Sequence, residues 1–130
     1  MSADSLPEDV KKFITLYIES VEQILVLQIL FENPERAWTI PELTLELRSA
    51  NSSIERRLNN FYSSGVLWPP AKEGDKIIFS PKGNEMEKSI RLLIKAFRER
   101  PSTTVEMIYS RPAQAIQAFA DAFKIRKDEK

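Results

Sequence analysis

The sequence predicts a mainly α-helical protein with one small β-hairpin. Over most of the chain, apolar residues recur at three- and four-residue steps, the period of an amphipathic helix. The exception is the stretch 66–80, where two short apolar runs, "VLW" and "KIIFS", flank the polar segment "PPAKEGD". Short apolar runs on either side of a turn rich in Pro, Gly and Asp are typical of a hairpin.

The region Pro7–Phe31 is predicted to form one long helix or two abutting helices. An apolar stripe runs from Val10 to Leu25 along one side of it. Ser20 and Gln23 have the spacing of a capping box, which would restart the helix at this point. "ENPERAW" ends the helix because Pro34 disfavours the helical conformation of the residue before it.

Two further helices are predicted on either side of the short polar turn "SAN". The first starts with the T-x-x-E capping box of Thr39 and Glu42, and the second starts with the S-x-x-E box of Ser52 and Glu55. Gly65 is expected to end the second of them. We favour this capping role for Glu55 over contact with a ligand. The buried face of the second helix is predicted to consist of Ile54, Leu58 and Phe61.

Helical periodicity returns after Gly83 and continues to the C-terminal region. Three helices are predicted there, carrying in turn Met86, Ile90, Leu93, Ile94 and Phe97; Val105, Ile108 and Tyr109; and Ala113, Ile116, Phe119, Ala120 and Phe123. The last stripe can fold back on the first of these helices or pair with a second chain. A homodimer through the C-terminal helices is therefore one expectation.

The composition argues against several classes of function. The 130 residues include no cysteine and no histidine, which excludes disulfides and thiol catalysis and removes the commonest general base and metal ligand. No Gly-rich phosphate loop or nucleophile elbow is present. We therefore expect a protein that is not an enzyme and that needs no cofactor or metal.

No apolar run approaches the ~20 residues that span a bilayer. The N-terminal "MSADSLPEDVKK" lacks the basic and then apolar order of a secretory signal. We expect a cytoplasmic protein without a membrane partner.

The net charge is zero, but its distribution along the chain is uneven. Residues 1–47 contain three basic and nine acidic side chains, residues 48–82 contain six basic and three acidic ones, and residues 83–130 contain ten basic and seven acidic ones. The positive excess thus begins just before the helix that starts with "NSSIERR". This asymmetry agrees with a polyanionic partner, although ordinary solvated faces produce similar ones.

The order helix, helix, turn, helix and hairpin resembles that of winged helix-turn-helix transcriptional regulators of bacteria, in particular small MarR-like proteins. The resemblance is carried by "WTIPELTLELRSANSSIERRLNNFYSSGVLW" with "KIIFSP", and it covers about Leu25 to Pro81. It implies a winged helix-turn-helix domain over 1–82, followed by a C-terminal helical extension over 83–130. It also implies a transcriptional regulator that binds double-stranded DNA.

In such a protein the helix after the turn enters the major groove, and residues near its N-terminus reach the base edges. Arg can contact guanine or phosphate, Asn can read adenine, and Ser can bind phosphate. The hairpin would meet the neighbouring backbone through its lysines. The predicted DNA-contacting residues are Ser52, Ser53, Arg56, Arg57, Asn59, Asn60, Lys72 and Lys76.

Glu55 departs from the pattern of these regulators, which usually carry a small hydroxyl residue at that place. A carboxylate can accept a hydrogen bond from a cytosine amine, but it also repels phosphate. With the zero net charge, this keeps open the alternative of a non-catalytic winged-helix module for protein–protein interaction. Trp38 and Trp68 are predicted to pack against the first helix rather than to stack on a ligand.

Overall fold

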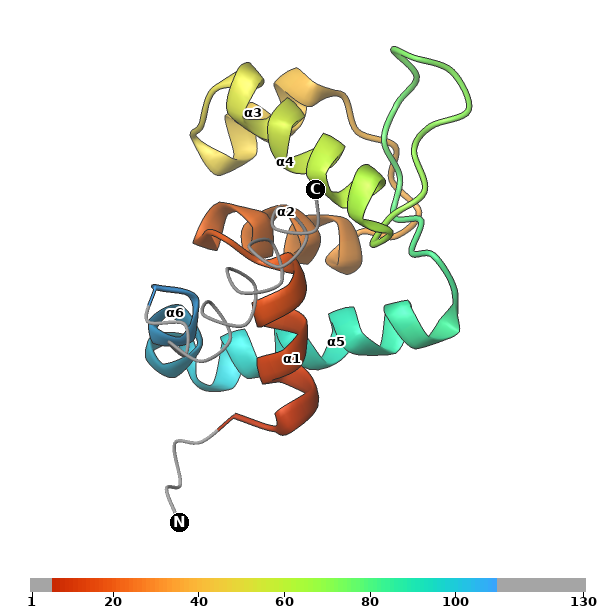
Figure 1. Cartoon of the computed structure of the whole chain (residues 1–130). Helices are drawn as coiled ribbons and strands as arrows, with labels where there is room; N and C mark the ends of the chain where they lie inside the picture. The colour runs from red at the N-terminus through yellow and green to blue at the C-terminus, as the bar shows by residue number, and fades with distance from the viewer. Residues whose placement is uncertain (1–5, 110–130) are drawn as a thin grey trace, which may run out of the picture.

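Six α-helices form the part of the chain that the structure, a computed structural model, describes: residues 6–109 (Figure 1). They are α1 (Glu8–Tyr17), α2 (Val21–Glu32), α3 (Ile40–Leu47), α4 (Asn51–Ser64), α5 (Asn84–Glu99) and α6 (Pro101–Tyr109). In Figure 1, α3 and α4 lie on one side of α2 and α5 lies on the other. The predicted last helix, from Ser110 onward, and the dimer contacts assigned to it lie outside the described residues.

The N-terminal region forms two helices that meet at 112°. The predicted capping box is confirmed, because Ser20 accepts from the N–H of Gln23 and the Gln23 side chain accepts from the N–H of Ser20 at 3.2 Å. The Gln23 amide also bonds the N–H of Glu19 and donates to the carbonyl of Tyr17 at 3.3 Å. A buried glutamine, 1% exposed, thus satisfies the backbone groups that the break in the helix leaves without partners.

The core is centred on α2, whose apolar residues face more than one neighbour. Ile24, Val26, Leu27 and Leu30 are fully buried, and α2 contacts α3, α4 and α5. The predicted buried face of α4, consisting of Ile54, Leu58 and Phe61, is confirmed. No single described helix is long and apolar enough to cross a membrane, and the sharply bent pair α1 and α2 passes that test only when the two are taken together.

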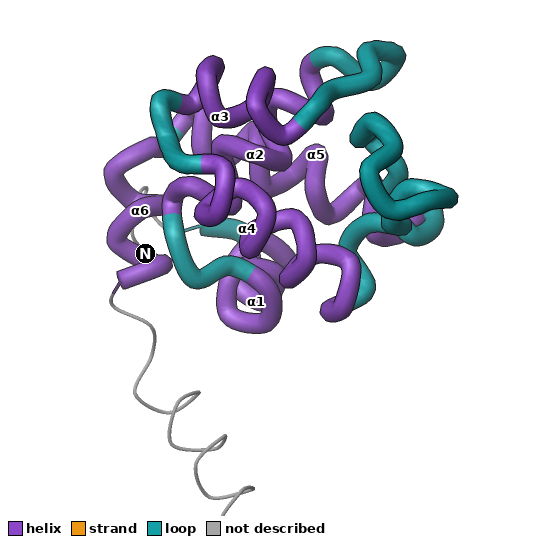
Figure 2. The backbone as a smooth tube through the Cα atoms, turned by 90° about the horizontal axis from the view of Figure 1, so that it is seen from above, coloured by secondary structure: helices purple, strands orange, loops and turns teal. Residues whose placement is uncertain are grey.

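The predicted β-hairpin at 66–80 is wrong, because the structure is all-helical over the described residues and contains no strand there (Figure 2). The segment between α4 and α5 is an irregular loop with two isolated antiparallel bridges, Leu67 with Pro81 and Trp38 with Ile77. Pro69 and Pro70 follow Trp68 directly and have no N–H to donate, so the pairing next to Leu67 cannot extend into a ladder. The fold expected from the winged-helix resemblance is corrected accordingly, since it requires this hairpin as its wing.

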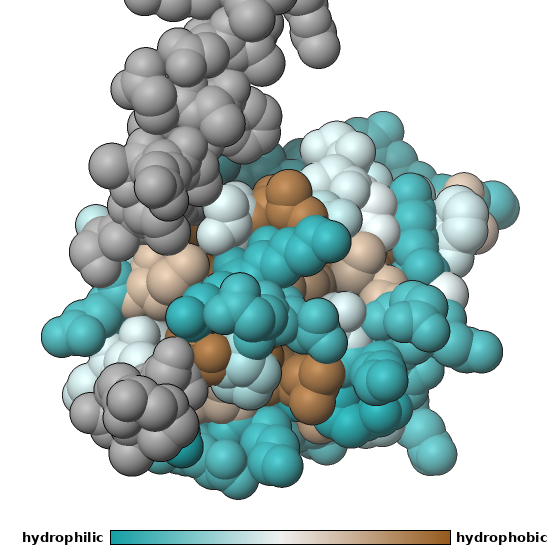
Figure 3. Space-filling view, turned by 60° about the horizontal axis from the view of Figure 1, so that its bottom comes forward, coloured by the Kyte–Doolittle hydropathy of each residue, from teal (hydrophilic) through white to brown (hydrophobic). Residues whose placement is uncertain are grey.

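The two tryptophans differ from the prediction that both pack in the interior. Trp38 is buried, at 2% exposed, whereas Trp68 is 59% exposed. The ammonium group of Lys82 lies 4.6 Å from the centre of the Trp68 ring, a cation–π contact at the surface. Apolar residues also reach the surface on the face shown in Figure 3. Leu16 of α1 is 53% exposed.

The break between α1 and α2 gives a first prediction. Gln23→Leu keeps the volume of the side chain but leaves the N–H groups of Glu19 and Ser20 and the carbonyl of Tyr17 without a partner. The three groups are partly buried, so each should cost about 1 kcal/mol, the low end for polar groups without partners, and we expect the free energy of unfolding to fall by about 3 kcal/mol in urea titrations. The half-buried Gln28 offers the control: Gln28→Leu should change stability by about 0.5 kcal/mol. Equal stability of the two variants would contradict the role given to Gln23.

Candidate nucleic-acid interface

The helices α3 and α4 contact each other and are joined by the three-residue turn 48–50. The predicted Thr39–Glu42 capping box at the start of α3 is confirmed: Glu42 N–H donates to Thr39 at 3.2 Å, and Thr39 N–H donates to the Glu42 carboxylate at 2.9 Å. The turn 48–50 is tight, with Arg48 in the left-handed conformation at φ 53°. Ser49 N–H closes the turn on the carbonyl of Thr44 at 3.0 Å. The direction of α4 is therefore fixed by backbone hydrogen bonds.

The predicted capping box at the start of α4 is wrong. The helix begins at Asn51, its N-cap is Ala50, and no side chain bonds the cap. Ser52 therefore lies inside the first turn, two residues past the N-cap position, and Glu55 is left with no capping role. Glu55 is exposed and lines a surface groove instead.

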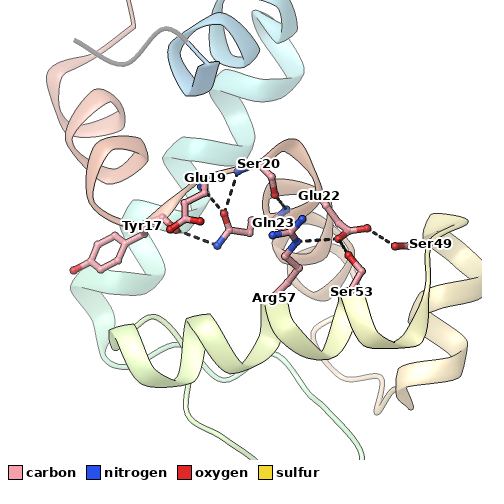
Figure 4. Close-up of polar contacts among 8 residues, drawn as sticks. All are labelled: Tyr17, Glu19, Ser20, Glu22, Gln23, Ser49, Ser53 and Arg57. Atoms are coloured by element: carbon pink, nitrogen blue, oxygen red, sulfur yellow. Dashed lines mark hydrogen bonds and ion pairs between the residues drawn. The ribbon is translucent and has the colours of Figure 1, made fainter. Parts of the chain in front are cut away.

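A polar cluster at the start of α2 holds α4 in place (Figure 4). The Glu22 carboxylate accepts hydrogen bonds from the hydroxyl groups of Ser49 and Ser53. It also accepts from Nε of Arg57 at 2.9 Å, with the Glu22 and Arg57 side chains only 21% and 18% exposed. Two of the predicted DNA-contacting residues, Ser53 and Arg57, are thus engaged inside the protein.

The environment of Glu22 favours its ionised form. Partial burial, the largest single influence, raises the pKa of its carboxyl, but the hydrogen bonds from Ser49, Ser53 and Arg57 and the positive charge of Arg57 together outweigh it. The pKa of Glu22 is therefore lowered from its ordinary value of 4.5. The cluster is a charged link from α2 to the turn 48–50 and the first half of α4.

The solvent side of α4 presents three of the predicted residues together. Ser52, Arg56 and Asn59 are exposed and follow one another at four- and three-residue spacing, which places them on one face. Among the described residues, no ion pair joins Arg56 to a carboxylate. Asn60 is half-buried and lies off this face.

A groove of about 530 Å³ separates this part of α4 from the loop 66–83. Its lining includes several apolar side chains, and its charged lining combines one lysine with three carboxylates. The groove is lined by Thr39, Ile40, Pro41, Glu55, Leu58, Asn59, Tyr62, Pro69, Pro70, Lys72, Glu73, Gly74, Asp75 and Ile77. Of the predicted loop residues, Lys72 therefore lies in the groove with Asn59 of α4.

Lys76 lies near the start of α3 instead. The pKa of Glu42 is lowered, first by the hydrogen bond from the Thr39 backbone and further by the positive charges of Arg36 and Lys76. The positive charge of Lys76 therefore lies close enough to the Glu42 carboxylate to be partly offset by it. The surface around α4 carries both signs of charge rather than a continuous positive strip.

Sequence reasoning missed Glu22. Its place in the first turn of α2 was readable from the Ser20–Gln23 spacing, but nothing in the sequence indicates that three donors from residues 49–57 meet there. The described residues contain no cluster of acidic side chains able to hold a metal ion. No protein-family profile, curated protein or solved structure matches the chain.

The Glu22 cluster gives a second prediction. Glu22→Gln removes the charge that three donors stabilise, so the free energy of unfolding should fall by about 1–3 kcal/mol at neutral pH. Because folding lowers the pKa of Glu22, the ionised carboxylate stabilises the protein above 4.5 and loses this effect as the pH falls through the lowered pKa. Urea titrations should therefore show the wild-type and Glu22→Gln curves converging below pH 4.5. A difference that stays constant from neutral to acidic pH would contradict the assignment.

Proposed function

We propose that this protein binds double-stranded DNA through the solvent face of α4 and acts as a transcriptional regulator. The observation that carries the proposal is the exposed set Ser52, Arg56 and Asn59 on α4, the second of two helices joined by a short turn. These are the side-chain types that contact phosphate, guanine and adenine. The proposal rests on the α3–α4 pair and does not need a wing.

The dimensions of α4 suit this role. A helix of 14 residues is about 21 Å long, and the DNA major groove is wide enough to admit an α-helix. Ser52 and Arg56 lie in its N-terminal half, the half that reaches base edges in helix-turn-helix proteins. Lys72, in the loop across the groove from α4, would contribute a contact to the neighbouring phosphate backbone under this proposal.

The groove supports a second candidate, a module that binds another protein. Its apolar lining, with Leu58, Ile77 and two adjacent prolines, offers an area that a side chain of a partner can cover. Glu55, Glu73 and Asp75 line the same groove, and they would repel a phosphate while attracting a basic residue. This candidate predicts weak DNA binding that no single residue of α4 controls.

A third prediction separates the two candidates. Arg56→Ala should weaken binding to a mixed-sequence duplex, because the variant loses a phosphate or base contact. If the lost contact is to phosphate, the slope of log affinity against log salt should become shallower by about 0.9. The measurement is a fluorescence anisotropy titration over a series of salt concentrations.

The control is Lys95→Ala, which removes one exposed positive charge from α5 on the other side of α2. Its affinity and salt slope should equal those of the wild type. If Arg56→Ala and Lys95→Ala weaken binding equally, the interaction reflects overall charge and the α4 interface is wrong.

A fourth prediction concerns Glu55, which faces the groove without capping the helix. Glu55→Gln should tighten DNA binding several-fold at low salt, because a negative charge beside the phosphates is removed. Thermal unfolding should be nearly unchanged, since Glu55 makes no capping hydrogen bond. A protein-binding module would show no gain in DNA affinity from this substitution.

A further inference from the structure

Arg56 and Arg57 are neighbours in sequence but have different surroundings. Arg56 is exposed on the solvent face of α4, whereas the Nε atom of Arg57 donates to Glu22 at 2.9 Å. Both side chains of the Glu22–Arg57 pair are partly buried, and the hydroxyl of Ser53 is bound to the same carboxylate. The two arginines are therefore a matched pair: the same side chain, one residue apart, with one charge free and one compensated.

The donors that meet at Glu22 are of the kinds that bind DNA phosphates. Serine hydroxyl groups and arginine guanidinium groups make many of the backbone contacts in protein–DNA complexes. Here they come from the turn between α3 and α4 and from the first two turns of α4, and a carboxylate of α2 occupies them (Figure 4). An arginine whose charge is compensated in this way releases no counterion when the protein meets DNA.

We propose that Glu22 is a positioning residue that withholds Arg57 and Ser53 from DNA while it fixes α4 against α2. This inference rests on the DNA-binding function proposed above. Under this inference Ser52 and Arg56 make the contacts of α4 with the DNA phosphate backbone, and Arg57 makes none. Glu22 thereby limits the non-specific affinity for DNA, because its carboxylate neutralises the positive charge of Arg57 on α4.

The substitution that tests this assignment is Glu22→Gln, which keeps the shape of the side chain and removes its charge. The guanidinium group of Arg57 then carries an uncompensated charge next to α4. The salt slope of DNA binding should steepen by about 0.9, and affinity at about 50 mM salt should rise roughly tenfold. A merely structural role for Glu22 predicts the opposite, since loosening α4 would lower affinity and leave the slope unchanged.

The experiment uses the full chain and a mixed-sequence duplex of about 20 base pairs, with anisotropy titrations at several salt concentrations. Circular dichroism confirms that each variant is folded at the temperature used. Glu99→Gln removes an exposed carboxylate at the end of α5 and controls for the change in net charge. The double variant Glu22→Gln with Arg57→Gln should return to the wild-type slope, because the freed charge is gone.

The arginine pair gives a test that does not depend on how well Glu22→Gln folds. Arg56→Gln should flatten the slope by about 0.9, whereas Arg57→Gln should leave the slope at the wild-type value. Equal flattening by the two variants overturns the inference, and so does a Glu22→Gln slope equal to that of the wild type. Failure of the proposed function looks different: neither the wild type nor Glu22→Gln would bind, or binding would not depend on Arg56.

Discussion

The burial of α2 is the constraint on which the rest of the structure depends. Its sequence, "VEQILVLQILFE", is apolar on nearly every side, so neighbours on a single face cannot cover it. The fold meets this demand with α3 and α4 on one side and α5 on the other. The helix proposed to meet DNA, α4, therefore packs directly against the core helix α2. Changes in the packing of α2 would reach α4 directly.

Polar contacts then fix the positions of α1 and α4 relative to α2, which apolar packing alone does not determine. Gln23 satisfies the backbone where the chain turns sharply between α1 and α2, and Glu22, the preceding residue, ties α2 to the turn and first half of α4. Successive residues of one helix turn thus fix the helices on both sides of it. Buried contacts of this kind cost much when one partner is lost. The exposed face of α4 inherits its orientation from them.

The sequence predicted the helices well because their signals are local. Apolar periodicity gave the buried face of α4, and the capping boxes beginning at Ser20 and Thr39 marked two true helix starts. The box at Ser52 and Glu55 failed because the turn 48–50 starts the helix earlier, which a spacing rule does not register. The hairpin failed because "PPAKEGD" was interpreted as a turn between two strands, whereas Pro69 and Pro70 follow Trp68 directly and cannot donate N–H groups that would extend its pairing.

The candidate site was predictable only in part, for a physical reason. Exposure of Ser52, Arg56 and Asn59 follows from helix periodicity, but the engagement of Arg57 depends on a carboxylate 35 residues away in sequence. The groove carboxylates likewise come together only through the path of the loop. Long-range charge pairing of this kind leaves no pattern in a single sequence.

The most direct test of DNA binding through α4 is the change in backbone amide chemical shifts when a mixed-sequence duplex is added to the isotope-labelled protein. The largest changes should fall on residues 51–59 of α4 and on the loop near Lys72, with little change along α5. Shifts spread evenly over all helices, or confined to α1, α5 and α6, would contradict the account.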